Sequence, residues 1–165
     1  MNYAPSMRPR ACLRYIMWAL AAMASEKYFS LHEHFYRQAR RYSEMDEMKG
    51  LGEVTISVAY CQCQILIAIY EFKKMYLVRS WLTIGKAVRI AMMLSLNRLD
   101  GDLTAKQVLP PPKDFTEKEE RRRTFWMVFF TDRHSSTCNG WTTAIDERDV
   151  GDSWLLPSTC VTCCF

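Results

Sequence analysis

The chain has 165 residues, of which 49% are hydrophobic and 24% are charged, so it is long enough for one domain with a hydrophobic core and has an ordinary globular composition. Its formal net charge of +4 is too small to indicate nucleic-acid binding from charge alone. Its seven cysteines are odd in number and irregularly spaced, which excludes the pattern of a secreted disulfide framework.

Apolar residues recur at helical spacing along most of the chain, and no segment alternates as a strand would. Capping-box pairs, Ser30 with Glu33 and Thr116 with Glu119, predict the starts of two of the helices. The pattern predicts an all-α single domain of five main helices, with an irregular C-terminal segment after Gly140. The expected helices cover residues 11–24, 30 to before 50, 54–74, 77–97 and 117–138.

Two apolar stretches could instead indicate a membrane span or a secretion signal. Residues 54–70 carry no charge, but the stretch is short for a span and contains polar side chains, which favours a buried central helix. Near the start, arginines precede the apolar residues 15–24, and Ala22-Met23-Ala24 has the form of a signal-peptidase site. We expect the first helix to be retained inside the cell and no membrane to be involved; a cleaved signal peptide is the alternative.

The most unusual stretch lies in the expected fifth helix, where an acidic pair leads into three arginines and then an aromatic pair. Successive helical positions are about 100° apart, so Arg121, Arg122 and Arg123 cannot all face the same way. At least one should face the core and need a carboxylate from another segment. Glu119 can pair with the second and third arginines along the helix. The candidate carboxylates for the buried arginine are Asp146, Asp149 and Glu71.

Two further features involve residues that would be costly without a structural reason. A buried Asp132 is expected to pair with Arg133 or with an arginine of another helix, unless it turns to solvent. The fourth helix carries Trp81, Gly85 and Arg89 at four-residue intervals. A glycine in mid-helix costs about 1 kcal/mol relative to alanine, so Gly85 is expected to permit close helix packing.

Together these helices resemble the regulatory domain of fungal zinc binuclear-cluster transcription factors, also called the middle homology region and including the xylanolytic-activator type. That family's pattern reads Glu, one residue, three Arg, an aromatic-Trp pair, an Asp-Arg and a Gly eight residues after the Asp, and the preceding helix carries Trp, Gly and Arg. The residues that match this signature, in a structural or regulatory role, are Trp81, Gly85, Arg89, Glu119, Arg121, Arg122, Arg123, Trp126, Asp132, Arg133 and Gly140.

The resemblance covers residues 11–157 and implies a partial copy of this domain, preceded by an N-terminal segment of residues 1–10. Residues 158–165 match nothing in the family and form an unassigned cysteine-rich tail. The family has Gly-Arg-Pro where this chain has Gly140-Trp141-Thr142, and it has Gly where this chain has Ser95. The cysteines of the tail are Cys160, Cys163 and Cys164.

The resemblance implies a regulator of RNA polymerase II genes in a metabolic or secondary-metabolite pathway, acting in the nucleus, with the cytoplasm as the alternative location. The family binds two zinc ions through a six-cysteine DNA-binding module, and that array is absent from these residues. We therefore expect no cofactor in this chain and DNA contact only through a missing module. The partners that the resemblance implies are a full-length regulator or co-regulator protein and a small-molecule inducer.

The sequence contains no clear pattern of a catalytic, metal or phosphate site, and no enzyme is expected. His32 and His34 are two residues apart on a helix and point to different faces, so they do not form a natural metal pair. The six glycines are isolated and form no phosphate-binding loop. The alternative function is a stand-alone helical module that binds a small molecule or protein, with a pocket among Trp81, Trp126 and the Met-rich helices.

Overall fold

The computed structural model describes residues 9–99, 108–146, 148 and 150, and within these ranges it contains five α-helices and no strand. The expected all-α fold is therefore confirmed. The tail of residues 158–165 and Asp149 lie outside the described residues. The α-helices are α1 (Ala11–Met23), α2 (His32–Glu47), α3 (Val58–Lys73), α4 (Leu77–Met93) and α5 (Phe115–Asn139). Short 3₁₀ turns are η2 (Glu26–Leu31), η3 (Glu53–Thr55) and η4 (Leu96–Arg98).

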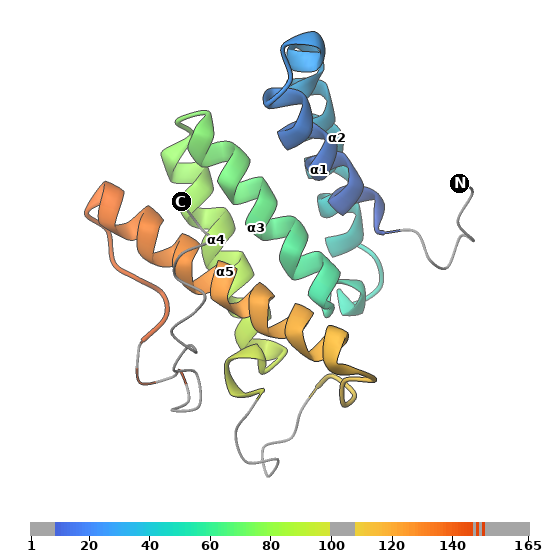
Figure 1. Cartoon of the computed structure of the whole chain (residues 1–165), viewed down its shortest axis with the longest axis vertical. Helices are drawn as coiled ribbons and strands as arrows, with labels where there is room; N and C mark the ends of the chain where they lie inside the picture. Colours follow the sequence, from blue (N-terminus) through green and yellow to red (C-terminus); the bar gives the residue numbers. More distant parts are fainter. Residues whose placement is uncertain (1–8, 100–107, 147, 149, 151–165) are drawn as a thin grey trace.

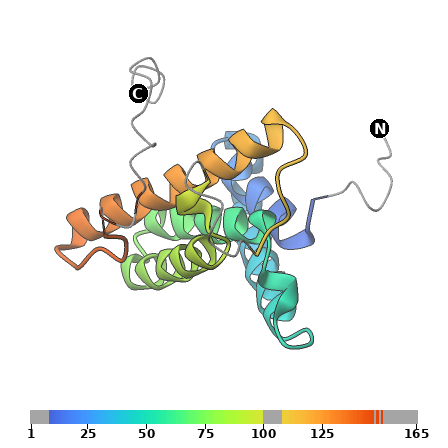
Figure 2. The same cartoon turned by 90° about the horizontal axis from the view of Figure 1, so that it is seen from below.

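The helices form two antiparallel hairpins and one crossing helix (Figure 1). One hairpin pairs α1 with α2, the other pairs α3 with α4, and α5 lies across α3 and α4. Figure 2 shows α5 along one side of the α3–α4 pair. The helix α3 packs against all four others, as expected from its apolar character on most sides.

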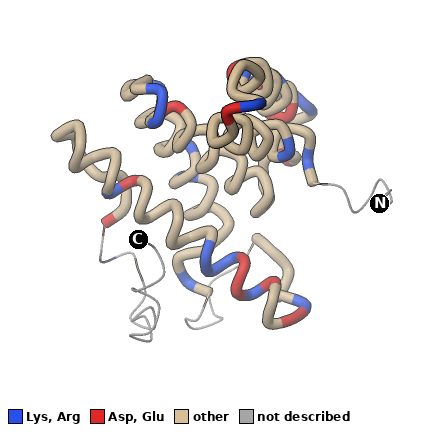
Figure 3. Tube along the Cα trace, turned by 45° about the horizontal axis from the view of Figure 1, so that its top comes forward, with Lys and Arg blue, Asp and Glu red and all other residues tan. Residues whose placement is uncertain are grey.

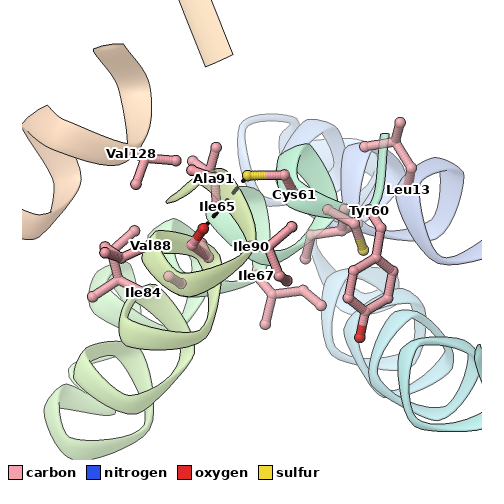
Figure 4. Packing of buried hydrophobic residues seen from close by; sticks show 14 of the residues in the cluster. Leu13, Tyr60, Cys61, Ile65, Ile67, Ile84, Val88, Ile90, Ala91 and Val128 are labelled. Atoms are coloured by element: carbon pink, nitrogen blue, oxygen red, sulfur yellow. Dashed lines mark hydrogen bonds between the residues drawn. The ribbon is translucent and has the colours of Figure 1, made fainter. Parts of the chain in front are cut away.

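Large apolar side chains from α3 and α4 form the centre of the core (Figure 4). Ile67 and Ile84 are almost completely buried, and the thiol of Cys61 donates a hydrogen bond to the Ala87 carbonyl over 3.6 Å. Burying one such isoleucine contributes about 1.5–3 kcal/mol relative to leaving it exposed. None of the described helices combines the length and the apolar character that crossing a bilayer requires.

The helix starts differ from the predicted capping boxes. The helix α2 begins at His32, directly after η2, and no side chain caps it, so the predicted start at Ser30 is wrong. The helix α5 begins at Phe115, because Asp114 accepts a hydrogen bond from the amide of Glu117 over 2.7 Å. Asp is a strong N-cap residue, and it lies two positions before the predicted cap Thr116.

The end of α4 explains one departure from the family pattern. Ser95 has a φ of 56°, in the left-handed region, and its amide donates a hydrogen bond to the Met92 carbonyl over 2.9 Å. A glycine usually takes this position after a helix, because it has no Cβ to crowd the backbone. The family's glycine suits this left-handed conformation. Serine adopts the same conformation here at a cost in backbone strain of about 1–2 kcal/mol.

Charged residues are spread over the described helices (Figure 3), and Asp46, Glu71, Arg121 and Asp132 are the buried ones among the described residues. Acidic and basic residues gather together at the first turns of α5, where the signature run lies. The charged residues of the central helix α3 are Glu71 and Lys73, both near its C-terminal end.

Candidate functional site

Arg121 is the arginine of the triplet that faces inward. Its side chain is 3% exposed, Nη1 donates to the Pro110 carbonyl over 2.8 Å, and Nη2 donates to Glu117 over 2.7 Å. The expectation of one inward arginine is confirmed, but the expected carboxylates were wrong for Asp146 and Glu71. Glu117 lies one turn earlier on the same helix, where it reaches the guanidinium without help from another segment.

Arg122 and Arg123 both bind Glu119, as expected from their spacing. The two distances are 2.7 Å from Arg122 and 2.9 Å from Arg123, and the Arg123 side chain is 76% exposed. These hydrogen bonds, first from Arg123 and then from Arg122, hold the pKa of Glu119 below its ordinary value. The pair with the exposed Arg123 contributes little to stability, whereas Arg122 and Glu119 are both partly buried on the helix surface.

Asp132 is 1% exposed, and among the described residues it binds backbone amides and no cation. Its carboxylate accepts hydrogen bonds from the amides of Ala144 over 2.9 Å and Ile145 over 3.2 Å. The expected ion pair with Arg133 or another arginine is therefore wrong. Amide donors compensate the lost hydration of a buried carboxylate as a cation would, and here they also position the chain that follows α5.

Arg133 and Gly140 complete the attachment of what we call the return segment, residues 140–146. Gly140 ends α5 with a φ of 67°, in the left-handed region. Arg133 donates to the Ile145 carbonyl over 2.9 Å, and its guanidinium lies 5.0 Å from the ring centre of Phe129. Ser136 donates to the Thr142 carbonyl over 3.1 Å. The turn thus keeps its glycine geometry despite the departure from Gly-Arg-Pro.

The matching residues of α4 point outward. Trp81 is half-buried and contacts Trp141 edge-to-face, with 5.2 Å between ring centres. Arg89 is exposed. A Cβ placed on Gly85 would meet no described atom within 4 Å, so the expected close packing at this glycine is wrong for the described part of the chain.

Glu71 forms a buried polar centre that sequence reasoning did not identify. The fully buried carboxylate accepts hydrogen bonds from the Tyr36 hydroxyl over 2.6 Å and from Thr83 over 2.8 Å, and Arg40 lies 3.8 Å away. This arrangement joins α2, α3 and α4. Burial, and then Glu71, raises the pKa of Tyr36 above its ordinary value. The signal in the sequence was a single acid at the end of a long uncharged stretch.

The buried histidine, His32, packs inside the domain. His32 is buried, and its Nδ1 lies 2.6 Å from the Tyr70 hydroxyl. Within the described ranges, no three His, Cys, Asp or Glu side chains are grouped so that they could hold a metal ion. The tail cysteines lie outside these ranges, so the absence of a cofactor stays a prediction.

Two hollows mark the described surface. The first, of about 430 Å³, is lined by Val78, Trp81, Leu82 and residues 140–142. The second, of about 620 Å³, lies between α1, α3 and α5; its lining includes Leu13, Met17, Leu66, Phe115 and Met127. Trp126 contacts Phe125 and Phe129 and lines neither of these hollows of the described residues, so neither hollow contains both Trp81 and Trp126.

Comparison with known proteins gives this arrangement a family. The model of the fungal specific transcription factor domain matches residues 2–152. The chain is 37% identical over 143 residues to the pigment biosynthesis transcriptional activator pigB of Monascus ruber, covering 86% of this chain and 26% of that protein. It is 33% identical over 141 residues to the citrinin biosynthesis transcriptional activator ctnR of Monascus purpureus, covering 86% of this chain and 24% of that protein.

A third relative is the ascochitine biosynthesis cluster transcriptional regulator of Didymella fabae, 29% identical over 143 residues, covering 87% of this chain and 24% of that protein. This chain thus spans about a quarter of the length of these relatives. No solved structure matches it. Because the family model covers most of its length, the chain belongs to the fungal specific transcription factor domain family.

Proposed function

We propose that this chain is regulatory sequence of a nuclear transcription regulator that controls a secondary-metabolite gene cluster. The observation that carries the proposal is the similarity, over 86% or more of the chain, to regulators of pigment, citrinin and ascochitine biosynthesis. The geometry is in keeping with a structural role for the signature, because Arg121 and Asp132 bind backbone groups and Arg122 and Arg123 bind Glu119.

DNA contact by such a regulator would come from a zinc module outside these residues, since the chain has no six-cysteine array to hold a recognition helix. The isolated chain should therefore give no sequence-selective shift in a gel assay with cluster promoters. Metal analysis of the isolated chain should find far fewer than two zinc ions per chain. A selective shift together with bound zinc would contradict this part of the proposal.

The regulatory role is tested in the host fungus. Deletion of the gene that contains this sequence should change the transcripts of a group of neighbouring biosynthetic genes together, and reintroduction should restore them. A fluorescent fusion of the encoded protein should accumulate in the nucleus. Unchanged cluster transcripts after deletion, or a fusion excluded from the nucleus, would refute the proposal.

A small-molecule inducer is the second candidate, favoured by the hollow between α1, α3 and α5. Its volume of about 620 Å³ lies within the range of about 300–1,000 Å³ typical of small-molecule pockets. Apolar intermediates of the pathway that the gene cluster encodes should bind in the hollow and raise the melting temperature of the domain. Leu66→Trp, which fills the hollow, should abolish that rise. Thermal shifts that are equal in the parent and the filled variant would assign the binding elsewhere.

A further inference from the structure

The outer face of α4 carries a second apolar stripe, opposite the face that enters the core. We call it the α4 outer stripe: Val78, Leu82, Gly85, Arg89 and Met93. Val78 is 60% exposed, Leu82 61% and Met93 41%. Steps of four, three, four and four residues place all five positions within about 80° around the helix, over a length of about 22 Å. This spacing is the one by which helices pack along a seam.

No residue that the structure describes covers the centre of the stripe. At its centre, a Cβ on Gly85 would meet no described atom within 4 Å, so a neighbouring backbone can approach closely there. At one end, Val78 and Leu82 border the hollow of about 430 Å³ that Trp81 and Trp141 also line. A large apolar side chain seated in this hollow, against the paired tryptophans, would have the character of an interface anchor.

The charges within and beside the stripe select the partner's chemistry. The helix α4 contains Arg79, Lys86 and Arg89 and no acidic residue. Lys86 binds Glu47 over 2.8 Å, whereas Arg89 forms no ion pair with any residue that the structure describes. A second copy of α4 laid along the stripe would bring cations against cations, which disfavours self-association. A helix with acidic residues beside its apolar face would complement the stripe.

We propose that the α4 outer stripe is the docking surface for an amphipathic helix of a partner protein, with leucine-like residues in the seam and Asp or Glu on its flanks. This interface goes beyond the proposed function, since it holds whatever genes the regulator controls.

The test uses two synthetic helices of about 20 residues, long enough to cover the stripe at 1.5 Å per residue. Both have leucine at the seam positions, and their flanks carry glutamate in one and lysine in the other. Binding to the full chain is followed by fluorescence anisotropy. We expect the glutamate helix to bind at least tenfold more tightly than the lysine helix, and Arg89→Glu to reduce or reverse that preference.

Leu82→Asp should weaken binding of the glutamate helix at least tenfold. Met48→Asp, at another exposed apolar residue, should leave that affinity unchanged. Circular dichroism verifies that both variants remain folded, as expected for side chains that are mostly exposed. Equal binding of the two helices, no binding of either, or binding that survives Leu82→Asp would overturn the proposal. So would dimerisation of the chain that Leu82→Asp abolishes, because the occupant would then be a second copy.

Discussion

Replacing Arg121 by alanine should destabilise the domain far more than replacing either neighbouring arginine. The side chain is 3% exposed, and its Nη1 donates to the Pro110 carbonyl over 2.8 Å. A hydrogen bond with a charged partner contributes about 1.5–3 kcal/mol, and loss of the buried aliphatic stem adds about 1 kcal/mol. The bond to Glu117 adds nothing to this sum, because that carboxylate is 34% exposed and water can replace the guanidinium. The expected loss is about 2.5–4 kcal/mol.

The neighbours provide the matched comparison on the same helix. Arg122 and Arg123 are 27% and 76% exposed and share Glu119, so each alanine variant should lose less than about 1 kcal/mol. Arg121→Met keeps the stem but not the hydrogen bonds, and it separates packing from the bond to Pro110. Urea unfolding at pH 7, followed by circular dichroism, measures all four variants. If the three alanine variants lose equally little, the reasoning fails and the triplet is only a solvated basic surface.

Four smaller predictions follow from the same structure. Gly85→Ala should raise the unfolding free energy by about 0.5–1 kcal/mol, because the added methyl meets open space in the described chain and alanine favours the helix. Ser95→Gly should raise it by about 1 kcal/mol, since glycine removes the strain of a left-handed φ; a loss in either urea titration would refute the corresponding account. Asp132→Ala should release the return segment, seen as faster amide exchange at residues 144–145 with α1 and α2 unaffected. Burial raises the pKa of Tyr36 and Tyr60 above the ordinary value of 10, so folding favours the neutral phenols. Their contribution to the free energy of unfolding is complete below pH 10 and falls as the pH rises above 10. A urea midpoint that stays constant from pH 8 to pH 11 would contradict this.

Helical periodicity was sufficient to predict the five helices, because the buried stripes of these helices repeat every three to four residues in the sequence. The predicted fourth helix, over residues 77–97, is α4 followed by η4, since the chain turns through the left-handed Ser95 between them. The cap positions were harder to predict, because several polar residues precede each helix and tertiary packing selects among them. Asp114 therefore replaced Thr116 as the cap of α5.

Partners of buried charges could not be predicted from spacing alone. The sequence identified Asp132 as a costly residue but gave no sign that the amides of Ala144 and Ile145 would fold back to meet it. Backbone donors are present at every non-proline residue and leave no mark in the sequence. The same limit applies to Arg121, whose acceptor in the loop is a carbonyl of Pro110. Glu71 was considered only as a partner of the arginine triplet, whereas in the structure it accepts hydrogen bonds from Tyr36 and Thr83 and pairs with Arg40.

The signature and the α4 outer stripe should differ in how their loss affects regulation. Arg121 binds a carbonyl before α5 and Asp132 binds amides after it, so both ends of this long polar helix depend on them for attachment to non-helical chain. Variants there would lower regulation by unfolding the domain or freeing the return segment, and the protein level should fall with activity. Leu82 contributes little to the described core because it is mostly exposed. A variant at Leu82 that abolishes cluster transcription at a normal protein level and melting temperature would therefore act through a lost contact with a partner, whereas parallel losses would place it with the structural residues.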